Sequence, residues 1–107
     1  MRLNGKRVLV SGGSNGIGRS LVEGFYREGA SVFFSYLNDA QSAERLCSVR
    51  NRRSVGSISA MRCDLADQKE TRTLVVSAIE ALGHIDVLVN NAAAFTRPAG
   101  LNVTGMA

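Results

Sequence analysis

Four glycines stand within eight residues near the start of the chain, in the stretch SGGSNGIG at residues 11–18. The stretch follows the apolar run VLV and leads directly into a helical pattern of apolar residues. A glycine-rich turn from a strand into a helix presents backbone N–H groups and the positive end of the helix dipole to an anion. The chemistry that this stretch predicts is therefore the binding of a phosphate group.

The glycines of this turn have separate predicted roles. Gly12 would permit a sharp turn, Gly16 would let phosphates approach the backbone, and Gly18 would let the helix pack against the strand. Ser14 and Asn15 add short polar side chains at the tip of the loop. The spacing GxxxGxG differs from the usual dinucleotide pattern GxGxxG, so an ordinary tight turn is one alternative.

A P-loop is the second alternative for the same stretch. Residues 13–20, GSNGIGRS, match the pattern GxxxxGK[ST] except that Arg19 replaces the lysine. The planar guanidinium is a poor substitute for the compact ammonium group that reaches the nucleotide phosphates. The later run IDVLVNN ends in Asn90 and Asn91, where a nucleotide hydrolase needs a carboxylate for magnesium. Both departures disfavour the P-loop.

Periodicity indicates the elements that would position the turn. Short apolar or β-branched runs predict strands at residues 6–11, 30–36, 58–63 and 85–91. Helical patterns separate them at residues 17–28, 39–53 and 67–82, with Asn38 or Asp39 and Asp67 as caps and Gly29 and Gly83 as stops. The faces predicted to be buried are Ile17, Leu21 and Phe25 in the first helix, and Leu74, Ala78 and Leu82 in the third.

This alternation predicts an α/β fold. The strands are nearly continuous apolar runs, so both faces of the sheet should be covered and the strands should be parallel. Right-handed crossovers then favour a Rossmann-like doubly wound parallel sheet of about four strands in the order 3-2-1-4. We expect residues 1–107 to form a single, incomplete dinucleotide-binding domain, with residues 95–107 as a frayed tail.

Two further motifs follow the later predicted strands. CDL at residues 63–65 follows the third strand, and NNAA at residues 90–93 follows the fourth. With the glycine turn they resemble the short-chain dehydrogenase/reductase family, whose motifs are TGxxxGIG, an aspartate with an aliphatic neighbour, and NNAG. The resemblance covers residues 3–97. Ser11 in place of threonine and Ala93 in place of the last glycine are the departures.

The resemblance implies a binding site for an adenine dinucleotide. Asp64 would accept a hydrogen bond from the adenine amino group, and Leu65 would pack at the adenine. Asn90 with Ala92 would line the cofactor and tie the fourth strand to its neighbours. Ile17 would join the residues of the glycine turn beside the phosphates. The alternatives without a ligand are that Asp64 is a solvated aspartate at the start of a loop, and that Asn90 and Asn91 are ordinary turn residues.

Cofactor choice depends on the end of the second predicted strand. Members that select NAD carry an acidic residue near the position of Tyr36, where a carboxylate would repel a 2′-phosphate. Tyr36 removes that repulsion, Ser35 could donate to the phosphate, and Arg19 or Arg45 could approach it. Asn15 stands where NADP-selective relatives often carry a cation. The pattern favours NADP over NAD without excluding NAD.

The catalytic residues of the family find no match in these 107 residues. Catalysis there needs a serine and a tyrosine with a lysine four residues later, beyond the NNAG motif. The two tyrosines, Tyr26 and Tyr36, are followed at that distance by Ala30 and Ala40. We therefore assign no catalytic residue and expect a dinucleotide-binding half that is inactive alone. A stand-alone dinucleotide-binding or interaction module is the alternative.

Composition limits which other classes of protein and partner the chain fits. The chain is 45% hydrophobic, carries a net charge of +4 and has no apolar run long enough to span a bilayer, so we expect a cytoplasmic protein without a membrane partner. The basic residues at 50–53 lack interleaved aromatics, which disfavours nucleic acid. Cys47, Cys63 and His84 have no metal-ligand spacing, and we predict His84 to be a surface residue. An unpaired edge on the fourth strand predicts self-association or pairing with a complementing chain.

Overall fold

The computed structural model describes residues 2–14, 16–49 and 56–91. Asn15, Ala92, the basic residues at 50–53 and the predicted tail at 95–107 lie outside the described residues. Seven elements alternate between strand and helix: β1 (Arg7–Ser11), α1 (Gly16–Arg27), β2 (Ser31–Tyr36), α2 (Ala40–Cys47), β3 (Ile58–Arg62), α3 (Gln68–Leu82) and β4 (Val87–Asn90).

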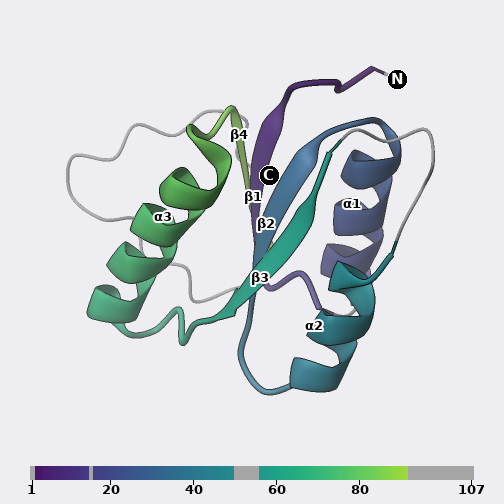
Figure 1. Cartoon of the computed structure of the whole chain (residues 1–107). Coiled ribbons are helices and arrows are strands. Elements are labelled where there is room, and N and C mark those ends of the chain that lie inside the picture. Colours follow the sequence, from purple (N-terminus) through teal and green to yellow (C-terminus); the bar gives the residue numbers. More distant parts are fainter. Residues whose placement is uncertain (1, 15, 50–55, 92–107) are drawn as a thin grey trace.

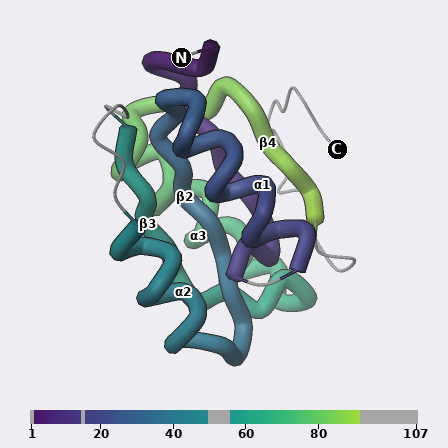
Figure 2. Tube along the Cα trace, turned by 90° about the vertical axis from the view of Figure 1, so that its right-hand side faces the viewer, coloured from purple at the N-terminus to yellow at the C-terminus, as the bar shows by residue number. Residues whose placement is uncertain are grey.

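The four strands form one parallel sheet in the order β3-β2-β1-β4, which confirms the predicted topology. Helices α1 and α2 cover one face, and α3 covers the other (Figure 1). Figure 2, turned by 90°, shows α1 and α2 side by side in front of the sheet with α3 behind it. Crossovers on both faces make the sheet doubly wound, as in the Rossmann architecture.

Alternate residues of each strand supply two separate cores. Val8 and Val10 of β1 pack with Phe34 of β2 beneath α1 and α2. Leu9, which lies between the two valines, and Phe33, which directly precedes Phe34, pack on the opposite face beneath α3. Successive side chains of a strand point to opposite faces, so a strand covered on both sides must be apolar throughout. This explains the uninterrupted apolar runs.

The orientation of α1 corrects the sequence prediction. Ile17 was expected to face the core, but it is 74% exposed. The buried face is instead Gly18, Val22 and Tyr26, one position further along. Leu21 and Phe25 are half-buried at its margin. The series that starts at Ile17 and the series that starts at Gly18 both have residues at intervals of four. The close contact of Gly18 with the turn decides which series is buried. The predicted face of α3, in contrast, is buried throughout and is confirmed.

The ends of the helices follow local hydrogen bonding. Asp39 caps α2 by accepting from Ser42 N at 3.0 Å, and Asp67 caps α3 by accepting from Lys69 N at 2.8 Å. The prediction that α2 reaches residue 53 is wrong, because the helix ends at Cys47 and Ser48 closes its last turn. Gly29 and Gly83 follow α1 and α3 with φ values of 96° and 90°. Within the described ranges, no helix has both the length and the apolar character needed to cross a bilayer.

Candidate functional site

The described parts of the three sequence motifs lie at one edge of the sheet, because the carboxyl ends of parallel strands share that edge. The glycine turn follows β1, and the β1–β4 register pairs Ser11 with Asn90. The β2–β3 register pairs Tyr36 with Arg62, which places the CDL motif beside the end of β2. Ligands of open α/β sheets bind outside this edge, near the point where the strand order reverses. Here that point lies between β1 and β4.

The first half of the glycine turn is tied to β2. Gly12 has a φ of 70°, and its N–H donates to Ser35 Oγ at 3.0 Å. Gly13 N donates to Ser35 O at 2.9 Å, and a Cβ on Gly13 would lie 2.7 Å from Phe34 Cβ. These two amides are therefore engaged within the protein. The amides at the start of α1 have no acceptor within the helix and can face an anion.

Gly16 and Gly18 differ sharply in their surroundings. Gly16 has a φ of +59°, and among the described residues, apart from its chain neighbours and the backbone of its own helix, no atom lies within 4 Å of the place where a Cβ would stand. A Cβ on Gly18 would lie 2.1 Å from Gly12 O and 2.7 Å from Asn91 Nδ2. Gly18 thus permits close packing of α1 on the turn, in line with its predicted role. Gly16 offers open space beside the positive end of α1, which fits a phosphate group.

Side chains hold the ends of β1 and β4 together. Ser11 Oγ lies 3.3 Å from both Val89 O and Asn90 Oδ1, and it accepts from Asn91 N at 3.0 Å. Asn91 Nδ2 donates to Gly12 O at 2.9 Å. The family resemblance implies that Asn90 lines the cofactor and ties β4 to its neighbours, whereas for Asn91 the sequence predicts only turn chemistry. The repeated asparagine and the hydroxyl at Ser11 were the available indications of this link.

The serines of the site lie deeper than predicted. Ser35 is 1% exposed and its Oγ accepts from Gly12, so it supports the turn from below. The predicted donation from Ser35 to a phosphate stays a prediction, and the structure adds a contact through which Ser35 supports the turn. Ser14, expected at the tip of the loop, is 6% exposed. Arg19 is exposed and pairs with Glu23 at 3.2 Å, one turn along α1.

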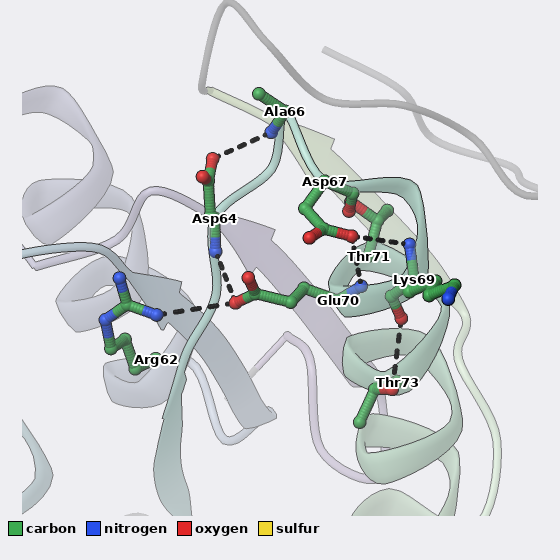
Figure 3. A network of polar contacts seen from close by, with 8 residues as sticks. All are labelled: Arg62, Asp64, Ala66, Asp67, Lys69, Glu70, Thr71 and Thr73. Atoms are coloured by element: carbon green, nitrogen blue, oxygen red, sulfur yellow. Dashed lines mark hydrogen bonds and ion pairs between the residues drawn. The ribbon is translucent and has the colours of Figure 1, made fainter.

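The loop after β3 presents a carboxylate at the same edge. Cys63 N donates to Tyr36 O at 2.8 Å, which extends the β2–β3 ladder by one step. Asp64 is half-buried, and its Oδ1 accepts from Ala66 N at 3.0 Å (Figure 3). Its Oδ2 accepts no hydrogen bond from the described residues. Leu65 is 7% exposed and packs in the core beneath α3, so only a small part of it can meet a ligand.

Local contacts and burial shift the pKa of a few side chains in the described part of the chain. Burial raises the pKa of the Cys63 thiol, which keeps it protonated and unreactive near neutral pH. The hydrogen bond from Arg7 N lowers the pKa of Asp86, at the opposite edge of the sheet. His84 lies beside Asp86 with its side chain 60% exposed, which confirms it as a surface residue.

Comparison with known proteins decides the family. The model of the short chain dehydrogenase family matches residues 6–104. The chain belongs to the short chain dehydrogenases. A 2,5-dichloro-2,5-cyclohexadiene-1,4-diol dehydrogenase of Sphingobium indicum is 36% identical over 91 residues, which are 85% of this chain and 34% of that enzyme. The chain thus spans about one third of the length of this curated relative.

Solved structures of short chain dehydrogenases share the fold. A short chain dehydrogenase from Burkholderia cenocepacia in complex with NADP matches with a TM-score of 0.80 and 37% identity, over 86% of this chain and 37% of that one. A 7α-hydroxysteroid dehydrogenase complexed with NADH and 7-oxo glycochenodeoxycholic acid matches with a TM-score of 0.74 and 36% identity, over 83% of this chain and 34% of that one. Structures similar to this chain therefore include complexes with each of the two cofactors.

Proposed function

We propose that the chain binds an adenine dinucleotide across the carboxyl edge of its sheet, as the cofactor-binding part of an NAD(P)-dependent oxidoreductase. The observation that carries the proposal is the meeting of an open, left-handed Gly16 at the start of α1 with the Asp64 carboxylate at one sheet edge. The open space at Gly16 suits the phosphates of a dinucleotide, and the Asp64 carboxylate suits the amino group of its adenine.

The residues would divide the cofactor between them. The backbone amides at the start of α1 would hold the phosphates, with the exposed Ile17 side chain beside them. Asp64 and the exposed margin of Leu65 would hold the adenine, and Asn90 would line the path between. Asn15 and Ala92 keep the roles that the family resemblance implies. When bound, the nicotinamide would supply reversible hydride exchange with a carbon of the substrate.

We further propose that these residues hold the cofactor without a proton donor for a carbonyl substrate. Tyr26 is 4% exposed and packs in the core beneath α1, and Tyr36 ends β2 with Ala40 four residues later. An acid must come within about 3 Å of the carbonyl oxygen. Incubation of the 107-residue chain with NADPH and 3-oxoacyl thioesters or ketosteroids should give no turnover. Steady turnover that Gly16→Val abolishes would contradict this.

A preference for NADP over NAD rests on the end of β2. Tyr36 places no carboxylate where it would repel a 2′-phosphate. Ser35 is buried and Arg19 pairs with Glu23 at the surface, so the preference rests first on Tyr36. We expect the chain to bind NADPH more tightly than NADH. Substitution of Tyr36 by Asp should reverse the order, because the new carboxylate repels the phosphate.

Calorimetry on the folded chain tests the binding proposal. We expect heat on titration with NADPH, and loss of that heat in Gly16→Val, because a branched side chain fills the open space beside α1. Gly5→Val is the matched control, since Gly5 also has a positive φ and open surroundings but lies before β1, at the other end of the sheet. Absence of heat with both cofactors, from a sample shown to be folded, would reject the proposal.

Two sequence predictions remain to be tested. One is a cytoplasmic location. The other is self-association or pairing with a complementing chain through the outer edge of β4, which among the described strands pairs with β1 alone. Sedimentation of the 107-residue chain over a range of concentrations would test the second, and a monomer at all concentrations would contradict it.

A further inference from the structure

The loop between β3 and α3 holds Asp64 between two buried neighbours. Cys63 is 2% exposed and Leu65 is 7% exposed, and both pack in the core beneath α3. Asp64 therefore lies on the outer side of a short segment that is anchored at both ends. Its backbone oxygen accepts from Asp67 N at 3.0 Å, and its Oδ1 accepts from Ala66 N at 3.0 Å. One backbone contact of Asp64 remains, at its N–H.

Glu70 supplies that last contact. Its Oε1 accepts from Asp64 N at 3.1 Å, and the same oxygen lies 3.4 Å from Arg62 Nη1. Figure 3 shows the Glu70 carboxylate between the Asp64 backbone and the Arg62 guanidinium, while the Asp64 carboxylate turns away toward Ala66. Glu70 thus holds the backbone of Asp64 by a hydrogen bond, and the Asp64 side chain points in another direction.

The contact is a displaced form of a common helix cap. Asp67 caps α3, and Glu70 stands three residues later, where a capping-box glutamate would normally accept from the N–H of the cap residue itself. Here Asp67 N donates to Asp64 O, so the Glu70 side chain reaches past it to Asp64 N. The first turn of α3 therefore fixes the loop that precedes it.

We propose that Glu70 is a positioning residue for adenine recognition, acting by fixing the backbone of Asp64 so that its Oδ2 faces the adenine amino group. This inference rests on the proposed binding of an adenine dinucleotide. Without the Glu70 carboxylate, the half-buried Asp64 N–H loses its acceptor, and Asp64 is held only by its contacts with Ala66 N and Asp67 N, which leaves its carboxylate less precisely placed. Arg62 plays a secondary part, because its pair with Glu70 is more than half exposed at the arginine.

Discrimination between adenine and hypoxanthine isolates this role. A dinucleotide with hypoxanthine carries a carbonyl oxygen in place of the amino group, so it has no donor for the Asp64 carboxylate at that position; its remaining ring donor is at N1. We expect the parent chain to bind its preferred cofactor about tenfold or more tightly than the hypoxanthine analogue, the size of a hydrogen bond to a charged group. A loss of general stability would weaken the binding of both ligands together and leave the ratio of their affinities unchanged.

Three variants at position 70 separate the contributions. Glu70→Ala removes the acceptor and should bring the ratio close to one. Glu70→Asp keeps the charge but shortens the side chain, so it should lower the ratio as well and serves where Glu70→Ala does not fold. Glu70→Gln retains an oxygen acceptor and should keep most of the discrimination. Glu80→Ala is the matched control, because it removes an exposed carboxylate further along the same helix.

The results distinguish this inference from the proposed function. A folded parent that binds neither dinucleotide refutes the proposed function and, with it, the inference. A parent that discriminates, together with Glu70→Ala or Glu70→Asp variants that discriminate equally well, refutes the inference alone. Hydrogen exchange at the Asp64 amide adds a reading without ligand. Exchange should be faster in Glu70→Asp than in Glu70→Gln, and equal rates would contradict the contact on which the inference rests.

Discussion

Replacement of Gly18 by alanine should destabilise the chain where α1 meets the glycine turn. The new Cβ would stand 2.1 Å from Gly12 O and 2.7 Å from Asn91 Nδ2, where ordinary contacts are 3.4–4 Å. The helix must move by about 1 Å, which costs roughly 1–3 kcal/mol as overpacking. Loss of the hydrogen bond from Asn91 to Gly12 adds about 1 kcal/mol. The higher helix propensity of alanine returns up to about 1 kcal/mol. The net loss is therefore about 1–3 kcal/mol.

Urea denaturation followed by circular dichroism measures this loss. Gly24→Ala is the matched control, because Gly24 lies in the same helix, and no described atom outside the backbone of that helix lies within 4 Å of its would-be Cβ. That control should raise the free energy of unfolding by up to about 1 kcal/mol. The midpoint of Gly18→Ala should fall without a change in slope. Equal stability of the two variants would refute the packing argument at Gly18.

Three other substitutions or treatments test separate contacts. Ser35→Ala should lower the free energy of unfolding by about 1–3 kcal/mol, measured in urea, because Gly12 N–H loses a buried acceptor. Asp86→Asn should destabilise the chain at pH 7, and the difference from the parent should shrink as the pH falls into the acid range. The hydrogen bond from Arg7 N lowers the pKa of Asp86, so its stabilisation is present above the ordinary pKa of about 3.9 and is lost as pH falls through the lower folded-state value. Cys63 should resist alkylation in the native chain, since burial raises its pKa, and mass spectrometry after timed labelling would show this.

The fold was predictable because its elements are marked by periodicity that tertiary packing reinforces. Strands covered on both faces are apolar throughout, and caps such as Asp39 and Asp67 are local features of the sequence. The frame of α1 was not predictable from spacing. Ile17 and Gly18 each begin a series at intervals of four, and only the contact between Gly18 and the turn selects the buried one.

The position of the site was predictable from the sequence, but the hydrogen bonds that hold its residues in place were less so. Motif order along the chain placed the glycine turn and Asp64 at one edge, because every strand is parallel. The contributions of Ser35, Asn91 and Glu70 depend on hydrogen bonds between residues that are 6 to 79 positions apart, which no local pattern encodes. Ser35 in particular reads as an accessible polar residue in sequence, and only the two covering layers show that it is buried.

The attachment of the glycine turn to β2 has a consequence for how binding competence arises. Ser35 accepts from both Gly12 and Gly13, so the turn takes its shape from a strand that comes more than twenty residues later. A peptide of residues 2–29 would contain the turn and α1 but neither acceptor. During folding, the turn therefore reaches its final form only after β2 has docked beside β1. Affinity for phosphate is in this sense a property acquired with the sheet, and its appearance in a refolding experiment would report strand pairing rather than helix formation.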